Sequence, residues 1–512
     1  MVGVPGRSKG CKTCRRRKKG CDLKVPECGQ CTERGFTCGG YDRDRIFINQ
    51  NAVRSTKLVS TETLETIFET LNPAYPKSQI GLFQLRQRSN TQPATFDIVL
   101  PQSLACSAFT ERVSELYLDA YLPSDESNKA LMIKQGLPSI LPLLTIRHDA
   151  LKTTLVAVYA AVTGLTHGDK VLTEEGKRMY GKGLQGFNRA LRNGSIADDD
   201  ALLAVPRFMG LFEVLFGAGI DVHQQGRSWQ AHTAGEVALM EARGPAAFNE
   251  GIPHLLFIEG RLAPIISAVA LRKATILDSE EWKTLPWKNH TKSAKDSLLD
   301  ILASTPEILE RIDMIRITPP YDCEEKITTL RTKCWNIEIE LEAWLAMNPN
   351  TILLTEDDVP MTVDYSNMVS AHLTVIYCTI CILLYSTIVG LDTMKSTPLS
   401  GFLLPDRQLS KKHPRQYARQ IARSAPYFFN PSAGIWGATM IAFPMGIALM
   451  TLQGVDPEAN WPYVEMIYEA WRNPKLPTAI QAFLVSIREE CQRRVSVALA
   501  QKIMNANMNS PQ

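Results

Sequence analysis

Six cysteines near the N-terminus constrain this chain more than any other feature of its sequence. The segment MVGVPGRSKG before them has no apolar core, so we expect no secretory signal and a reducing compartment. In such a compartment, clustered thiols bind metal rather than pair as disulfides. The spacing C-x2-C-x6-C occurs twice, and the six residues are Cys11, Cys14, Cys21, Cys28, Cys31 and Cys38.

The number of sulfurs indicates how many metal ions the segment holds. Structural zinc is bound by four thiolates in a tetrahedron, so one ion would leave two of the six sulfurs over. Two ions need eight ligand positions, which six sulfurs fill only if two of them bridge. The repeat favours its first cysteines, Cys11 and Cys28, as the bridges. One ion would then be bound by Cys11, Cys14, Cys21 and Cys28, and the other by Cys11, Cys28, Cys31 and Cys38. A disulfide-linked module and a single-zinc ribbon with two spare cysteines are the alternatives.

The positive charge of the chain is concentrated beside these cysteines. The whole chain has a net charge of +3, whereas residues 1–40 hold ten Lys or Arg against three acids and the rest is mildly acidic. A basic block on such a body predicts a polyanionic partner for the N-terminus alone. The cations that concern us are Lys12, Arg15, Arg16, Arg17, Lys18 and Lys19.

This segment resembles the fungal-type binuclear zinc cluster of transcription factors. The resemblance rests on all six cysteines, on the basic run between the second and third of them, and on Pro26 before the fourth. It implies a two-zinc DNA-binding module over residues 1–40, with a short helix after each cysteine pair and a proline that is commonly cis. It also implies that the end of the first helix enters the major groove at a CGG triplet. There, Lys18 and nearby backbone carbonyls would read the bases.

The chemistry of DNA agrees with these roles. Guanine presents N7 and O6 to the major groove, and a lysine or arginine can donate to both. The other cations, Arg15, Arg16, Arg17, Lys19 and Lys12, suit phosphates, which position a protein without specifying sequence. Taken alone, a basic run is also typical of a solvated face or of a nuclear import signal.

These observations together predict a zinc-dependent, sequence-specific transcription factor of RNA polymerase II. We expect it in the nucleus, bound to double-stranded DNA with CGG-type triplets and in contact with the transcription machinery or co-regulators. The resemblance implies control of a gene set, for which specialised metabolism and nutrient use both stay open. The alternative is a zinc-stabilised nuclear adaptor protein that does not read bases.

The region 41–104 is polar, and we predict a flexible linker there. It contains one short amphipathic piece, formed by Leu64, Ile67, Phe68 and Leu71, which Pro73 ends. A stable coiled coil needs about three to four heptads. The residues after the cluster should therefore not dimerise, and any homodimer should form through the C-terminal region.

From 105 to 505 the apolar residues recur at a helical period, and 506–512 form a short tail. Runs at 109–120, 151–162 and 180–191 show it clearly, and we expect the last two to end at Gly164 and at Asn193-Gly194. Similar stripes lie near 329–345, 366–389, 415–423 and 478–500. The predicted fold class is therefore mostly α: a small two-zinc cysteine module, a linker, and one large all-α domain.

Two stretches without charged residues, 365–391 and 424–455, are long enough to span a membrane. The first contains many Ser and Thr residues and the second contains three prolines and several glycines. These residues favour buried helices of a large domain, so we expect no membrane partner.

The C-terminal region also resembles, more weakly, the helical regulatory domain that follows such clusters in many fungal factors. That resemblance implies regulatory or partner-binding roles for an α-helical domain. It rests on short pieces: Trp229, His232, Gly235, 243–245, Arg261, 272–273, Trp282 and 286–287.

No enzymatic constellation emerges from the sequence. His223 and His232 are nine residues apart, an offset that does not place both on one helical face. Cys378 and Cys381 lie in an apolar stretch without a second pair, as small buried residues do. We find no phosphate loop, dinucleotide-binding glycine fingerprint or nucleophile elbow, so we predict that the chain is not an enzyme.

Overall fold

The computed structural model divides the chain into two compact units, Met1–Glu62 and Thr63–Gln512. All regular elements in the described residues are helices, so the predicted mostly α fold is confirmed. The structure describes residues 11–22, 28–38, 102–125, 129–130, 132–133, 136–193, 199–217, 222–317, 323–355, 359–393, 412–454 and 457–472.

The first unit contains two one-turn helices, α1 (Lys12–Arg16) and α2 (Gly29–Thr32). The resemblance placed each helix after its cysteine pair, which is wrong by a few residues. Each helix begins one residue after the first cysteine and includes the second. The reason is the two-residue spacing, because residues three apart lie on the same face of a helix and can direct both sulfurs to one side. Pro26 lies outside the described residues.

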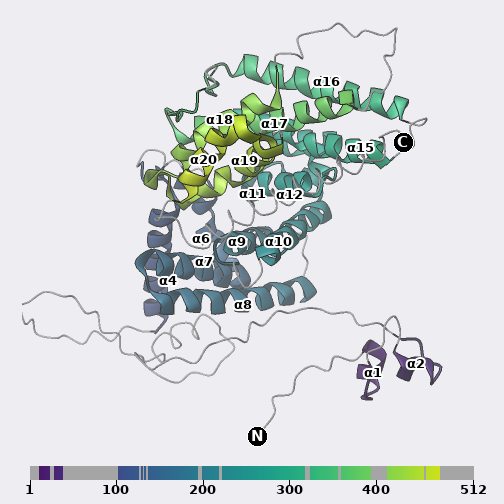
Figure 1. Ribbon diagram of the computed structural model, residues 1–512. Coiled ribbons are helices and arrows are strands. Elements are labelled where there is room, and N and C mark those ends of the chain that lie inside the picture. The colour runs from purple at the N-terminus through teal and green to yellow at the C-terminus, as the bar shows by residue number, and fades with distance from the viewer. Residues whose placement is uncertain are drawn as a thin grey trace, which may run out of the picture. The chain divides into compact units, whose positions relative to one another are not determined.

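The second unit begins with a group of long helices packed around α7 (Asp149–His167) (Figure 1). Apolar residues at the predicted helical period, such as Leu151, Leu155 and Val162, are almost completely buried in α7. The helices that pack in this group are α4 (Gln102–Tyr121), α6 (Leu141–Arg147), α8 (Lys170–Asn193), α9 (Asp200–Phe216) and α10 (Val222–Arg243).

Close packing of α7 against α8 explains where the prediction of a helix end failed. We expected α7 to end at Gly164, but it continues to His167 and is capped by Gly168, whose φ is 70°. A Cβ at Gly164 would lie 2.6 Å from Thr173 Oγ1, and one at Gly176 would lie 2.7 Å from Ala161 Cβ. Gly164 is therefore needed for the close approach of two helices and not for a turn. The described part of α8 reaches Asn193, and Gly194 of the predicted stop lies outside the described residues.

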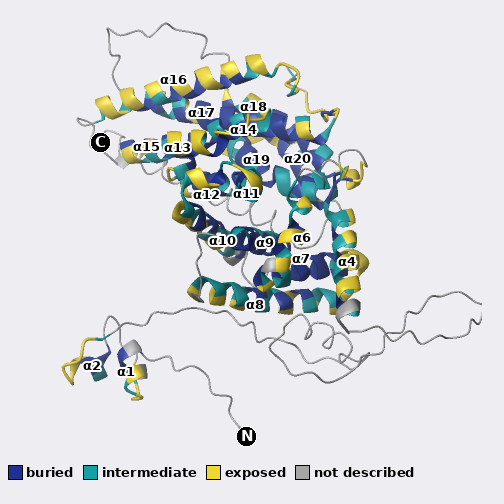
Figure 2. Cartoon of the chain, turned by 180° about the vertical axis from the view of Figure 1, so that it is seen from behind, coloured by how far each residue is buried: buried dark blue, intermediate teal, exposed yellow. Residues whose placement is uncertain are grey.

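The remaining helices form the other half of this unit, with α17 (Met368–Thr393) enclosed among its neighbours (Figure 2). The predicted stripes near 329–345, 366–389 and 415–423 lie in α16, α17 and α18 and are confirmed. Besides α17, this half consists of α11 (Gly251–Gly260), α12 (Leu262–Leu271), α13 (Glu280–Thr284), α14 (Ala294–Ala303), α15 (Thr305–Ile317), α16 (Glu324–Met347), α18 (Pro414–Phe428), α19 (Gly434–Gly454) and α20 (Pro457–Trp471).

Three segments are long and apolar enough to cross a membrane, judged by length and composition alone: Gly251–Leu271, Met368–Asp392 and Pro431–Gly454. Their most apolar windows are 56%, 78% and 61% buried inside the protein. The last two overlap the charge-free stretches seen in the sequence, and α17 packs on α15, α16, α18 and α19. Their apolar side chains thus serve largely to build the helical core.

Several predictions from the sequence fall on residues that the structure does not describe. They concern the linker up to residue 101, its short amphipathic piece, the stripe at 478–500 and the tail at 506–512. The first helix of the large unit, α4, begins at Gln102 and so takes in the last residues of the predicted linker.

Candidate metal centre

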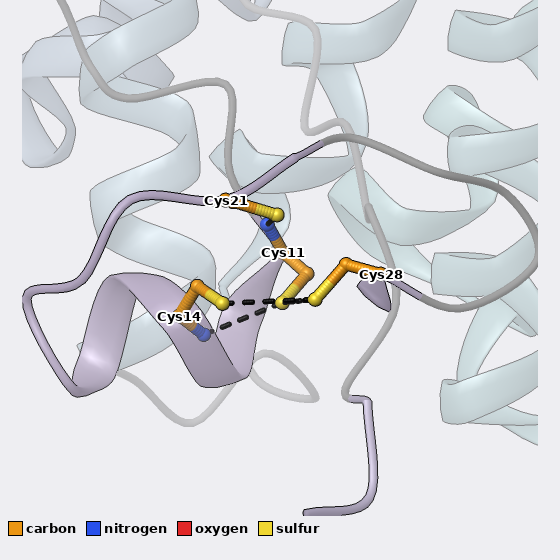
Figure 3. A group of neighbouring side chains, drawn as sticks. All are labelled: Cys11, Cys14, Cys21 and Cys28. Atoms are coloured by element: carbon orange, nitrogen blue, oxygen red, sulfur yellow. Dashed lines mark hydrogen bonds between the residues drawn. The ribbon is translucent and has the colours of Figure 1, made fainter. Parts of the chain in front are cut away.

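The two short helices bring the cysteine sulfurs into one cluster. Cys11 and Cys28 each precede a helix, while Cys14 and Cys31 lie within the first turn. Figure 3 shows Cys11 and Cys14 directing their sulfurs toward that of Cys28. The Cys11 Sγ lies 3.6 Å from Cys28 Sγ and 3.7 Å from Cys31 Sγ, and the Cys14 Sγ lies 3.6 Å from Cys28 Sγ.

The sulfurs form two sets of four, each with all its members within 4.8 Å of one another. Both sets contain Cys11 and Cys28. With a zinc–sulfur bond of about 2.3 Å, the edge of a tetrahedron is about 3.8 Å, close to the separations in this cluster. The donor set therefore fits two tetrahedral zinc ions with two shared sulfurs. The first set is Cys11, Cys14, Cys21 and Cys28, and the second is Cys11, Cys28, Cys31 and Cys38.

Hydrogen bonds and burial act in opposite directions on these thiols. The backbone N–H of Cys14 donates to Cys11 Sγ at 3.3 Å, and this bond lowers the pKa of the Cys11 thiol to about 6. Burial raises the pKa of Cys14 to about 12 and also raises the pKa of Cys28. Because zinc binds thiolates, metal binding has to release the protons that these two buried thiols hold.

The two halves of the cluster are alike in their backbone contacts as well as in their spacing. The N–H of Cys11 donates to Cys21 Sγ at 3.4 Å, and the N–H of Cys28 donates to Cys38 Sγ at 3.5 Å. Each bond ties the last cysteine of a half to the first one. The duplicated sequence thus builds a duplicated structure.

The basic run lies at the end of α1 and in the turn that follows it. Arg16, Lys18 and Lys19 are exposed, and Lys18 has a left-handed backbone with φ 53°. Arg17 is half-buried, because its guanidinium carbon lies 3.7 Å from the centre of the Phe36 ring. Lys12 and Arg15 belong to α1, and their side chains lie outside the described set.

Three side chains that the sequence analysis did not single out hold the two halves together. The ring of Phe36 packs against the Arg17 guanidinium. Both carboxylate oxygens of Asp22 accept the N–H of Gly29 at 3.0 Å. Thr13 Oγ1 donates to the Thr37 carbonyl at 2.9 Å. Asp22 could have been noticed in the sequence, because it is an acid that directly follows the third cysteine within a basic block.

The polar residues that weakly suggested a regulatory domain or an enzyme serve to join helices. Arg243 pairs with Asp200 at 2.7 Å, and Arg261 pairs with Asp300 at 2.6 Å. His232 Nε2 lies 2.9 Å from the Tyr180 hydroxyl.

The cysteine pair of α17 offers no second metal centre. Cys378 and Cys381 are fully buried, and burial raises the pKa of both thiols. Within the described parts of the chain, the two sulfur sets are the groups of His, Cys, Asp or Glu arranged to hold a metal ion.

Comparisons with known proteins agree with the division of the chain into a cysteine module and a large helical unit. The family model of the fungal Zn(2)-Cys(6) binuclear cluster domain matches residues 9–45, and that of the fungal specific transcription factor domain matches residues 106–421. The chain is also similar to an uncharacterized protein of Emericella nidulans, AN5342, with 28% identity over 155 residues. That match covers 30% of this chain and 31% of AN5342, so less than a third of the relative's length is spanned. No solved structure matches the chain.

Proposed function

Because the chain belongs to the fungal transcription factors that combine a binuclear zinc cluster with a fungal specific helical domain, we propose that it is a sequence-specific regulator of RNA polymerase II that reads CGG-type triplets. Its N-terminal cluster binds two zinc ions, and it is not an enzyme. We assign all six cysteines as ligands, with Cys11 and Cys28 as the bridges. The two sulfur sets that share these residues are the observation that supports this assignment.

A comparison of the two halves supports a role for the basic run outside the fold. Residues 15–19 are three arginines and two lysines, whereas the equivalent residues 32–36 are Thr, Glu, Arg, Gly and Phe. Both halves nevertheless form a short helix that ends in the same kind of turn. The zinc fold therefore does not require most of these cations. A dense row of cations, of which Arg16, Lys18 and Lys19 are exposed, suits the phosphates of double-stranded DNA.

We assign different tasks to the cations of this row. Lys18 reads the bases, since it is exposed at the tip of the turn and can donate to guanine N7 and O6. The other cations bind phosphates and so position the module on DNA. They are Lys12, Arg15, Arg16, Arg17 and Lys19.

We further propose a nuclear location and protein partners for this chain. A regulator of this kind acts in the nucleus, and the basic run can also serve nuclear import. The helical domain provides the surface for co-regulators or the transcription machinery and for homodimer formation. Its described residues include no second basic run comparable to the one after Cys14.

Binding of the full chain to duplexes with a CGG triplet or a scrambled triplet, over a range of salt, tests this function. Lys18→Ala should lose about 1–3 kcal/mol at the CGG site and narrow the gap to the scrambled site. The matched variant Lys19→Ala should weaken both sites about equally and reduce the salt slope by about one. Wild-type protein that binds both duplexes equally would instead support a zinc-stabilised adaptor.

A further inference from the structure

Lys18 and Gly35 occupy the same place in the two halves of the cluster, and both have a left-handed backbone. Their φ angles are 53° and 67°. In each half the next N–H closes the turn, from Lys19 to the Cys14 carbonyl at 3.1 Å and from Phe36 to the Cys31 carbonyl at 2.9 Å. A left-handed residue followed by such a bond is the usual way in which a helix ends at its C-terminus.

The two residues differ in what this conformation costs. Glycine adopts it freely, whereas a residue with a side chain brings Cβ too close to the backbone. A Cβ at Gly35 would meet nothing within 4 Å, so the conformation and not lack of space favours glycine there. The first half has a lysine at the unfavourable position. Within the described residues, Lys18 makes no hydrogen bond or ion pair that would compensate.

Neighbouring contacts hold the strained turn in place. Arg17, directly before Lys18, lies over Phe36, which directly follows Gly35. The two turns therefore brace each other, and the backbone of Lys18 is fixed on both sides. Strained residues of this kind persist where the surrounding structure over-determines them, and they cluster at functional sites.

We propose that the left-handed turn at Lys18 is a specificity device, in which the module accepts a less stable helix end so that one lysine is presented in a fixed geometry to DNA. The inference rests on the proposed function for its purpose, but the conformational cost can be measured without DNA. It makes Lys18 the one cation of the run whose place in the backbone, and not only its charge, determines recognition.

Zinc retention of the full chain measures the conformational cost of the left-handed backbone at Lys18. Because zinc binding and folding of the cluster are coupled, relief of strain strengthens metal binding. Lys18→Gly should raise the chelator concentration at which half the zinc is lost by about fivefold. The matched variant Gly35→Lys adds the same strain in the other half, where Cβ has open space, and should lower that concentration about fivefold.

DNA binding at saturating zinc tests whether the left-handed turn at Lys18 contributes to the preference for CGG. Lys18→Gly should lose most of the preference for CGG over the scrambled duplex, while Gly35→Lys should keep it. The double variant Lys18→Gly/Gly35→Lys conserves charge and strain, so its zinc retention should return to the wild-type value while the CGG preference stays lost.

The two measurements fail independently. Unchanged or weaker zinc retention in Lys18→Gly overturns the proposed strain, whatever happens to DNA binding. If Lys18→Gly retains zinc more strongly but keeps the CGG preference, the turn is strained but has no role in recognition, and the proposed specificity device is overturned. If the wild-type chain shows no CGG preference at all, the proposed function fails, and the specificity device fails with it even where the strain is confirmed.

Discussion

Arg17 differs from the other cations of the basic run because its guanidinium already has a partner inside the module. A cation over an aromatic ring contributes about 0.5–1 kcal/mol at exposed sites. Phe36 is 45% exposed, so the contact with Arg17 lies at this lower end. The edges of the guanidinium remain available to a phosphate, and we therefore expect Arg17 to act on both the cluster and DNA.

Variants of this pair separate the two contributions. Phe36→Ala and Arg17→Ala should each lower zinc retention by about two- to fivefold, in line with about 0.5–1 kcal/mol. Only Arg17→Ala should also flatten the salt dependence of DNA binding, because only it removes a positive charge. Arg16→Ala is the matched control, which should change the salt slope and leave zinc retention as it is. Equal salt slopes in wild type and Arg17→Ala would show that Arg17 does not contact phosphate.

Some residue contacts of the cluster could be predicted from the sequence and others could not. The grouping of the cysteines was predictable, because the spacing and the four-fold coordination of zinc leave few arrangements. The contacts of Arg17 with Phe36 and of Asp22 with Gly29 were not, because they depend on how the two halves fold onto each other. The left-handed backbone of Lys18 was not predictable either, because a lysine disfavours that conformation.

At the scale of elements, each short helix is too small to be stable alone, and the metal has to supply the folding free energy. Cys11→Ser should therefore lose both zinc ions, because the proposed bridge belongs to both sites. Cys38→Ser, which removes a ligand of one site only, should retain more zinc than Cys11→Ser. Native mass spectrometry of the full chain gives the stoichiometry. One zinc and two titratable thiols in the wild-type cluster would contradict the bridged arrangement.

Acid should release the zinc from these elements. Cys14 and Cys28 have raised pKa values, so each exchanges a proton for metal and zinc affinity rises with pH. Below about pH 6 the Cys11 thiol, with its lowered pKa, is protonated as well, and the affinity should fall more steeply. We expect zinc loss between pH 7 and 5 while the helical circular dichroism of the large unit persists. Zinc content that is constant over this range would contradict the assignment.

In the large unit the helices are joined by buried charges that the sequence did not reveal. Arg261 is 2% exposed, directly before α12, and pairs with Asp300 in α14 at 2.6 Å. Arg261→Ala removes a buried cation from Asp296 and Asp300 and leaves Asp300 with Lys292, so it should destabilise the domain by about 1–3 kcal/mol. Arg316→Ala removes an exposed pair with Asp313 and should cost under about 1 kcal/mol. Urea unfolding of both variants provides the comparison, and equal losses would contradict a structural role for Arg261.

Helical periodicity was nevertheless enough to predict several of the long helices of this unit. A regular apolar stripe indicates that a segment is helical, as in α7 and α17, and in α8 it also indicates which face packs on the core. Helix ends were less predictable, because a glycine such as Gly164 serves either as a stop or as a point of close contact. Only the neighbouring helix decides between these two uses.

For the whole molecule, the change from a basic, cysteine-rich segment to a helical pattern predicted an N-terminal module and a large α unit. The two family matches cover residues 9–45 and 106–421, so the first extends a few residues into the predicted linker and the second begins just after it. We propose that this division separates DNA recognition by the cluster from regulation by the helical unit. A single triplet, as we propose for the cluster, offers few base contacts, so we expect one cluster alone to bind weakly and a second cluster on the same DNA to strengthen binding.

Assembly is therefore the property in which this chain should differ from factors that dimerise next to the cluster. Only about one heptad of apolar residues precedes Pro73, far short of a coiled coil. A fragment of residues 1–80 should sediment as a monomer at micromolar concentration, while the full chain forms any dimer through its helical domain. With linkers as flexible as the sequence predicts, two joined clusters should gain affinity by effective concentration and tolerate variable spacing of their triplets. A dimeric fragment, or strict dependence of the full chain on one spacing, would contradict this arrangement.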